Sequence, residues 1–465
     1  MLRAGVVATA GLAGCSDDGG DDQPRDGGET APDRETETEA GADTVGGTPD
    51  AGESPEETAT EAATETETET TAEERGKPRA LGDEWPTFQS GAERSGYSAR
   101  NTPPSAPVAE AWRQDLSPVA RPEAHGQPTL VDGTVYTAFN CSGGADDPRL
   151  CLLAVDAVTG EEVWRESTTP ATPDGALVSV QTSTAHGGGR VYAETDRGYL
   201  VAADAGTGTV QWDRQFQSVS DNLDGTLLYS EGTLYAHAGP TGNTYDEGEG
   251  GIRAVDAASG DTLWSFTDLQ SFGTLAAVDG TLVAKGDSRA TTYGLDPETG
   301  EVRWSTDAYP TSRFGCRDGT CYAYGGSAHA FGTDGTQVWG REGVAFSPRA
   351  PDEFGPAVAN GRAFFPTADE GVVALETASG DELWRSGGGD DTRGRTVGTP
   401  VLAGDGGTVY TTTDVEVLAL DAASGDVQWR YELDANATSD VVVGNGALYL
   451  TCRGGESPPR LLALA

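Results

Sequence analysis

Six cysteines are the residues of this 465-residue chain whose spacing most directly suggests chemistry. Cys316 and Cys321 flank the turn sequence Arg-Asp-Gly-Thr, so the two thiols can face each other across a β-hairpin. Cys141 and Cys151 flank a loop containing Gly, Asp and Pro, and they can pair between neighbouring strands in the same way. Two local disulfides suit an oxidising exterior. Cys452 is left over, and we expect it to be buried rather than reactive.

Metal-binding and catalytic patterns are weak by comparison. No cysteine spacing suits zinc, and no phosphate-binding loop or nucleophile elbow stands out among the many glycines. The acidic clusters at 246–249 and 390–391 offer the oxygen ligands that calcium prefers, but in so acidic a chain we favour solvated loops. We expect ordinary strand or turn positions for the four histidines, which are His125, His186, His237 and His329. The sequence therefore predicts no catalytic residue and no metal site.

Two segments match the acceptor pattern for N-linked glycans, Asn-x-Ser/Thr. They begin at Asn140 and Asn436. We expect both to lie in surface loops, where such a pattern is reachable, although short motifs of this kind often go unused.

The N-terminus resembles a lipoprotein export signal. Residues 1–14 form a short apolar stretch with Arg3 as its positive charge, and the ending Leu-Ala-Gly before Cys15 resembles a lipobox. In such a signal the cysteine is lipid-modified and becomes the first mature residue. Residues 15–80 contain Thr-Glu alternation and no aromatic residue, so they cannot bury enough apolar surface to order themselves. We predict a lipid anchor at Cys15 and a disordered acidic stalk.

Charge is strongly one-sided. Asp and Glu number 75 against 30 basic residues, giving a net charge of −45, and only Lys77 and Lys285 are lysines. The composition resembles that of proteins from extremely halophilic archaea, where hydrated carboxylates keep proteins soluble in high salt. Such a background argues against nucleic-acid binding, which needs basic patches. No run of eighteen apolar residues predicts a membrane-spanning helix.

A repeat occupies the rest of the chain. Its clearest copy runs from Ala154 through Asp156, Thr159 and Gly160 to Trp164. Asp and Thr side chains can hydrogen-bond the backbone of a turn, Gly accepts its left-handed conformation, and the indole can bury against a neighbouring unit. We therefore assign a structural docking role to eight tryptophans: Trp112, Trp164, Trp212, Trp264, Trp304, Trp339, Trp384 and Trp429.

A hairpin signal precedes each copy of the repeat. Asp132-Gly133 and Asp279-Gly280 lie between alternating apolar residues, as two-residue turns with positive φ require. Each unit thus reads as four antiparallel strands, and spacings of 35 to 52 residues between successive repeat tryptophans fit one propeller blade each. The fold prediction is an all-β, eight-bladed propeller over residues 81–465.

Closure of the ring follows from the two ends of this region. Residues 461–465 begin a repeat that has no Asp, Gly or Trp after it, and the missing tryptophan strand is found at 108–112. If the N-terminal strand completes the last blade, the clasp leaves no sheet edge open.

The repeated Ala-x-Asp-x-x-Thr-Gly-x-x-x-Trp pattern resembles the PQQ-like (pyrroloquinoline quinone) propeller family over residues 83–465. The segment Trp-Pro-Thr-Phe-Gln at 85–89 is similar to the lead-in before the first blade of that family. One branch implied by the resemblance holds PQQ and calcium, with a catalytic aspartate and a disulfide of adjacent cysteines, and this chain has no Cys-Cys pair. The other branch comprises BamB-like lipoproteins, which bind partner proteins.

The leading functional hypothesis is a monomeric, non-catalytic scaffold that is lipid-anchored at the outer face of the cell membrane. Its partner would be another membrane or extracytoplasmic protein, and it needs no cofactor. The alternative is a PQQ-dependent oxidoreductase acting on alcohols or sugars. A third hypothesis is a solute- or glycan-binding surface protein.

Overall fold

The computed structural model describes residues 84–116, 127–141, 149–169, 183–195, 198–216, 227–238, 251–269, 274–285, 291–307, 313–324, 327–342, 355–367, 371–386, 398–454 and 457–465. All of them belong to one compact unit. The predicted signal peptide, Cys15 and the stalk at 15–80 lie outside the described residues. So do His125 and the acidic clusters at 246–249 and 390–391.

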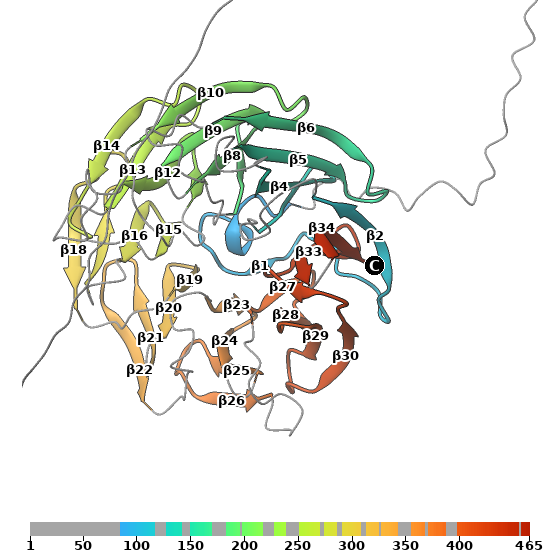
Figure 1. Cartoon of the computed structure of the whole chain (residues 1–465). Helices are drawn as coiled ribbons and strands as arrows, with labels where there is room; N and C mark the ends of the chain where they lie inside the picture. The colour runs from blue at the N-terminus through green and yellow to red at the C-terminus, as the bar shows by residue number, and fades with distance from the viewer. Residues whose placement is uncertain are drawn as a thin grey trace, which may run out of the picture. The chain divides into compact units, whose positions relative to one another are not determined.

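Eight antiparallel sheets stand around a common centre, which confirms the predicted eight-bladed propeller (Figure 1). The strands of the first four blades, from the centre outward, are β3 (Thr129–Val131), β4 (Thr134–Asn140), β5 (Leu150–Asp156) and β6 (Glu162–Thr168); β7 (Ala185–Gly187), β8 (Arg190–Glu194), β9 (Tyr199–Asp204) and β10 (Val210–Gln215); β11 (Leu228–Ser230), β12 (Thr233–Ala238), β13 (Gly251–Asp256) and β14 (Thr262–Phe266); and β15 (Thr274–Val278), β16 (Thr281–Lys285), β17 (Thr292–Leu295) and β18 (Val302–Thr306).

The next three blades repeat this order. They comprise β19 (Phe314–Arg317), β20 (Thr320–Tyr324), β21 (Ser327–Gly332) and β22 (Gln337–Glu342); β23 (Ala357–Ala359), β24 (Arg362–Thr367), β25 (Gly371–Glu376) and β26 (Glu382–Arg385); and β27 (Val401–Ala403), β28 (Thr408–Thr412), β29 (Glu416–Asp421) and β30 (Val427–Glu432). The short strand β1 (Tyr97–Ser98) adds to blade 7 by pairing in parallel with β27.

Blade 8 is built from both ends of the propeller, as the clasp prediction requires. Its outer strand is β2 (Glu110–Asp115), and the other strands are β34 (Ser457–Leu464), β33 (Ala447–Gly454), β32 (Val442–Gly444) and the short β31 (Asn436–Ala437). Trp112 lies opposite Ala463, and Figure 1 shows blue β2 beside red β34. The N-terminal strand therefore closes the outer side of the ring.

The hairpin turns between the two inner strands of a blade adopt the left-handed backbone that the sequence predicted. Asp132 and Gly133 have φ of 49° and 66°, and Asp279 and Gly280 have φ of 46° and 69°. A short polar residue followed by glycine tolerates this conformation at least cost.

Each outer strand also shifts its register directly before its tryptophan. In blade 3, for example, Ala254 pairs with Trp264 and Val255 with Thr262, so Leu263 is left out of the ladder. The same irregularity occurs in all eight blades. The bulge aims the indole out of its own sheet and toward the next blade. No helix among the described residues is long and apolar enough to cross a membrane.

Candidate functional site

The tryptophans of the repeat join neighbouring blades through one recurring hydrogen bond. The indole N–H of Trp212 in blade 2 donates to the carbonyl of Ala257 in blade 3 at 3.2 Å. The full set of such bonds is Trp112 to Ala157, Trp164 to Ala205, Trp212 to Ala257, Trp264 to Pro297, Trp304 to Thr333, Trp339 to Thr377 and Trp384 to Ala422. Each acceptor follows directly after the aspartate position of the next copy of the repeat.

The turn glycine of the next blade makes this contact possible. A Cβ on Gly260 would lie 2.8 Å from the Trp212 ring, and one on Gly300 would lie 2.5 Å from Trp264. Both glycines also have positive φ, 76° and 73°. Two independent constraints therefore favour glycine at this position: the left-handed backbone and the indole ring that lies against it.

A tyrosine supplies a second donor to the same carbonyl. The hydroxyl of Tyr192 donates to Ala257 at 3.0 Å, beside Trp212, and burial raises the pKa of Tyr192 to about 12, so it stays protonated. Tyr449, Tyr136 and Tyr235 do the same at three other interfaces. Sequence reasoning missed this role, although a signal was present: each of these tyrosines lies three residues after the glycine of a hairpin turn.

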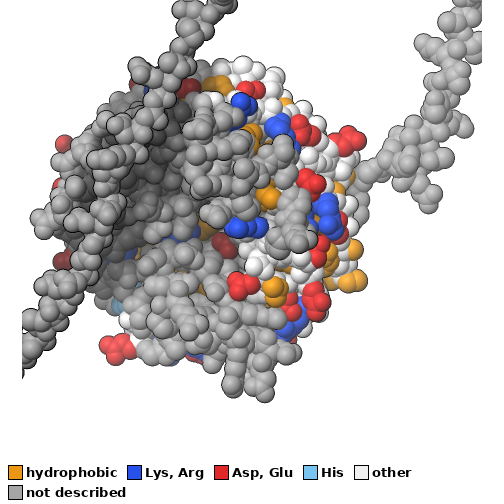
Figure 2. Space-filling view, in the orientation of Figure 1, with side chains coloured by type: hydrophobic (Ala, Val, Ile, Leu, Met, Phe, Trp, Pro, Cys, Tyr) orange, Lys and Arg blue, Asp and Glu red, His pale blue; other side chains and the backbone are white. Residues whose placement is uncertain are grey.

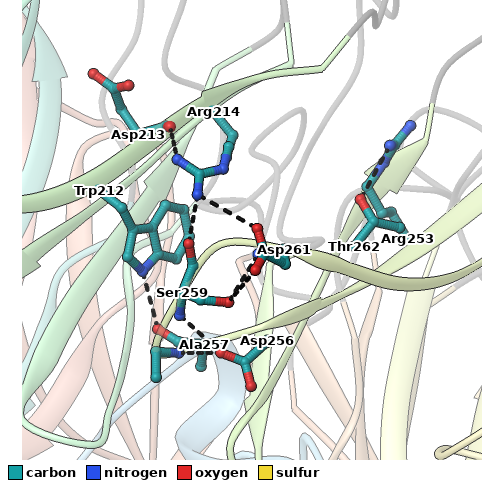
Figure 3. A network of polar contacts seen from close by, with 10 residues as sticks. Trp212, Asp213, Arg214, Arg253, Asp256, Ala257, Ser259, Asp261 and Thr262 are labelled. Carbon is teal, nitrogen blue, oxygen red and sulfur yellow. Dashed lines mark hydrogen bonds and ion pairs between the residues drawn. The ribbon is translucent and has the colours of Figure 1, made fainter.

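The turn that receives the tryptophan is held by its own side chains (Figure 3). Asp256 accepts the N–H groups of Ala258 and Ser259 at 3.0 and 2.7 Å, and the Ser259 hydroxyl donates to Asp261 at 3.0 Å. From the previous blade, Arg214 donates to the Ser259 carbonyl at 2.6 Å and pairs with Asp261 at 3.6 Å. The ion pair is exposed, so its contribution is small beside the buried indole contact.

The interface between blades 7 and 8 departs from this pattern. Within the described part of the chain, the Trp429 indole N–H has no acceptor of the kind used by the other seven tryptophans. Trp429 is half-buried, packs against the hydrophobic core around blade 8, and lies 6.0 Å from the Tyr410 ring. Blade 8 has no Asp-x-x-Thr-Gly turn among its described residues, because its outer strand is β2, which comes from before blade 1.

Residues 84–102, which we call the hub segment, contact the inner edge of every blade. Figure 1 shows the segment in blue at the centre of the ring, with the short 3-10 turn η1 (Phe88–Ser90). In blade order its contacts are Trp85 with Leu130, Pro86 with His186, Thr87 with Leu227, Ala92 with Ala277, Glu93 with Cys316, Ser95 with Val358, Gly96 with Leu402 and Asn101 with Val443. The sequence placed this segment before the first blade, and the structure places it inside the ring.

Two buried arginines lie at the middle of the hub segment, Arg94 within the segment and Arg313 beside it. Arg94 is 1% exposed, donates to the backbone carbonyl oxygens of Leu227 and Leu275, and lies 5.4 Å from the centre of the Phe88 ring. Arg313 lies over the same ring at 4.9 Å. Burial, together with the nearby charge of Arg313, lowers the pKa of Arg94 to about 9. The centre of the ring is thus filled at this level by the chain's own side chains.

The cysteines and the first glycan acceptor pattern lie in different environments. Cys141 bonds to Cys151, and Cys316 bonds to Cys321 across the β19–β20 hairpin. Cys452 is free and fully buried, and burial raises its pKa to about 12. Asn140 corrects an expectation: it is 5% exposed at the end of β4, not in a surface loop, because β4 continues further than the hairpin pattern indicated.

The three histidines within the described ranges occupy strands. His186 lies in β7, His237 in β12 and His329 in β21. Burial lowers the pKa of His186 to about 4, and its ring lies 5.5 Å from that of Tyr136. His186 is therefore a neutral, packed side chain at ordinary pH.

The described residues do not fit the quinone and calcium site that the resemblance to PQQ enzymes implies. Calcium needs a cluster of oxygen ligands, and among the described residues no three His, Cys, Asp or Glu side chains come together as a metal site would require. The buried charges beside the Phe88 ring are those of Arg94 and Arg313, which are cationic and cannot serve as calcium ligands. The chain also lacks adjacent cysteines.

The surface carries mixed charge where it is described. Figure 2 shows acidic and basic side chains scattered among one another on the visible described surface, without a gathered basic area.

Comparison with known proteins gives relatives of two kinds. The solved BamB from Moraxella catarrhalis matches 77% of this chain and 98% of its own, with a TM-score of 0.56 at 18% identity. The quinohemoprotein alcohol dehydrogenase of Comamonas testosteroni matches 83% of this chain and 81% of its own, with a TM-score of 0.61 at 15% identity. At these identities the likeness concerns the fold.

One curated relative has higher identity over a shorter stretch. Quinohemoprotein alcohol dehydrogenase ADH IIB of Pseudomonas putida is 31% identical over 166 residues, which are 34% of this chain and 21% of that protein. The chain thus matches about a fifth of the length of the curated relatives.

A family model covers most of the propeller. The model described as outer membrane protein assembly factor BamB matches residues 107–306 and 248–449. These matches take in outer strands and turns from all seven complete copies of the repeat. The chain therefore belongs to the family of the outer membrane protein assembly factor BamB.

Proposed function

We propose that this protein is a non-catalytic scaffold that binds another membrane or extracytoplasmic protein. A lipid on Cys15 and the acidic stalk at 15–80 would hold the propeller at the outer face of the cell membrane. We expect the scaffold to act as a monomer, and β2 and β34 of the same chain complete blade 8, so the ring needs no second copy to close.

One observation carries the proposal: the residues of the repeat are occupied in joining blades at seven of the interfaces. The turn aspartate caps its own turn, the glycine receives the indole, and the tryptophan and tyrosine donate to one carbonyl, as Asp256, Gly260, Trp212 and Tyr192 do between blades 2 and 3. The repeat thus specifies a rigid ring and leaves partner recognition to residues that differ between blades.

Crosslinking tests the scaffold proposal. The full-length protein is crosslinked on intact cells, enriched, and its crosslinked peptides are identified by mass spectrometry. We expect one protein to be recovered through crosslinks that cluster on one side of the ring. The matched control carries Cys15→Ser, which would remove the anchor and lower the recovery. Recovery of no specific partner from the anchored protein would contradict the proposal.

A second function, a quinone-dependent oxidoreductase, is favoured by the 31% identity to ADH IIB of Pseudomonas putida. Titration of the folded protein with PQQ in molar salt and calcium distinguishes the two, followed by tryptophan fluorescence and calorimetry. We expect no saturable binding. One-to-one binding at micromolar affinity would replace the scaffold proposal and call for a screen of alcohols and sugars with an electron acceptor.

A further inference from the structure

Asn436 presents a glycan acceptor pattern on the surface of blade 8. It lies in β31, a two-residue strand at the edge of its sheet that pairs only with β33. Asn436 and Thr438 are both exposed, while Ala437 between them is half-buried. The side chains at the two recognised positions of Asn-x-Thr therefore point to the same, solvated side of an extended segment.

The hydrogen bonding around this segment leaves the acceptor amide available. Within the described part of the chain, the Asn436 amide makes no hydrogen bond, whereas the Thr438 hydroxyl donates to the Thr451 hydroxyl at 3.0 Å. The backbone N–H groups of Ala437 and Thr438 bond to Asp414 and Thr451. The segment is thus fixed by its backbone and by its threonine, and a group added to the Asn436 nitrogen would displace no internal contact.

Asn140, which begins the other Asn-x-Ser/Thr pattern, is its structural opposite. It is 5% exposed, it pairs with Leu150 inside blade 1, and the next residue, Cys141, is disulfide-bonded to Cys151. A glycan on this buried amide would have to open the packing that covers the Asn140 side chain. The folded propeller can therefore carry a glycan at Asn436 but not at Asn140.

We infer that Asn436 is an N-glycosylation site of this protein and that Asn140 is not. The inference rests on the extracytoplasmic location in the proposed function. In the transfer, the amide nitrogen of Asn436 forms a bond to C1 of an oligosaccharide, and the bond from C1 to a lipid-linked phosphate breaks. The amide loses one proton, and the lipid phosphate leaves with the electron pair. The edge position of β31 lets the segment enter a transferase without opening the sheet.

Peptide mass spectrometry of the full-length protein, purified from membranes of its native host, tests the inference. We expect the peptide with Asn436 to carry a glycan mass and the peptide with Asn140 to be unmodified. Asn436→Gln should remove the entire glycan mass from the protein, and Asn140→Gln should leave it unchanged. Thr438→Val should abolish the modification and Thr438→Ser should retain it, with equal melting temperatures showing that the Asn436→Gln and Thr438→Ser proteins fold.

The N-terminal peptide of the same sample separates the two proposals. A lipid-modified Cys15 with unmodified Asn436 overturns the glycosylation site and leaves the anchored scaffold standing. A glycan on Asn140 overturns the argument from burial. An unprocessed N-terminus in a protein recovered from the cytoplasm overturns the extracytoplasmic location, and the glycosylation site with it.

Discussion

The indole ring of Trp212 lies so close to the α-carbon of Gly260 that a side chain on Gly260 would come within 2.8 Å of it. The two residues belong to different blades, and the same relationship is found at six further interfaces of the ring. Each indole is at once a hydrogen-bond donor and a flat surface on which the next turn rests.

Gly260→Ala should therefore destabilise the propeller more than the same change at a glycine with open space. Gly280 is the matched control, because its φ of 69° is similar to the 76° of Gly260 and a Cβ there would meet nothing within 4 Å. We expect Gly280→Ala to lower the free energy of unfolding by about 1–2 kcal/mol through the left-handed backbone alone. Gly260→Ala should add about 1–3 kcal/mol of overpacking. Equal decreases in the free energy of unfolding of the two variants in denaturant titrations would show that the Trp212 indole can move away from the new side chain at no cost.

Trp264→Ala should lower the free energy of unfolding by about 3–5 kcal/mol, because it empties an interface and removes the hydrogen bond to Pro297. Leu263 precedes it in the chain and is 53% exposed. Leu263→Ala should change stability by less than about 0.5 kcal/mol. If Trp264→Ala left the melting temperature unchanged and removed a ligand instead, Trp264 would belong to a binding site rather than to an interface.

Tyr192 and Trp212 should show coupled contributions, since they donate to one carbonyl oxygen. Tyr192→Phe and Trp212→Phe each leave the Ala257 carbonyl with one donor. Tyr192→Phe should therefore lower the free energy of unfolding by only about 0.5–1.5 kcal/mol. The double variant leaves that carbonyl without a partner. Its loss should exceed the sum of the single losses by about 0.5 kcal/mol or more in a double-mutant cycle. Strict additivity would mean that water replaces both donors.

The turn aspartates should make the propeller less stable in acid. Hydrogen bonds, first of all that from the Ser259 N–H, lower the pKa of Asp256 below its ordinary value of 3.8. Hydrogen bonds shift four other turn aspartates in the same direction: Asp204, Asp296, Asp334 and Asp421. Because their pKa is lower when folded, their stabilisation is complete above about pH 4 and is lost as the pH falls through the lowered values.

Melting temperatures between pH 6 and pH 2 at constant salt check this acid dependence. Asp256→Asn removes one of the titrating groups and should make the decline below pH 4 shallower. Asp268 is exposed and makes no hydrogen bond among the described residues, so Asp268→Asn should leave the slope unchanged. The same slope in all three proteins would exclude the turns as its source.

The hub segment should stabilise the ring through Asn101. This residue is 1% exposed, donates to Val443 at 2.7 Å and accepts the N–H of Glu84. Asn101→Ala leaves the buried carbonyl of Val443 unpaired and should lower the free energy of unfolding by about 1–3 kcal/mol in chemical denaturation. Arg100→Ala, at an exposed neighbour, should be nearly neutral. A neutral Asn101→Ala would mean that the hub segment adds no stability at blade 8.

The ring and its docking residues could be predicted because each repeats and each has a local cause. Asp132-Gly133 dictates a left-handed turn, and the Asp156 to Trp164 pattern returns often enough to count blades. The hub segment could not be predicted, because a single copy of Trp85 to Asn101 has no periodicity, and its partners lie far apart in the chain. The burial of Asn140 could not be predicted for a related reason. The length of β4 is set by its pairing with β5, and no local sequence pattern indicates that length.

The hub segment also sets the order in which contacts should break when the chain is pulled from its N-terminal side. A pull on the chain from the N-terminal side of Glu84 first loads Trp85 at blade 1, and the contacts to the following blades then give way one after another. The clasp strand β2 begins only at Glu110. Release of residues 84–110 would lengthen the extended chain by on the order of 90 Å, at about 3.4 Å per residue. Under tension from that side, we therefore expect the hub segment to detach from the blades before the blades themselves are strained.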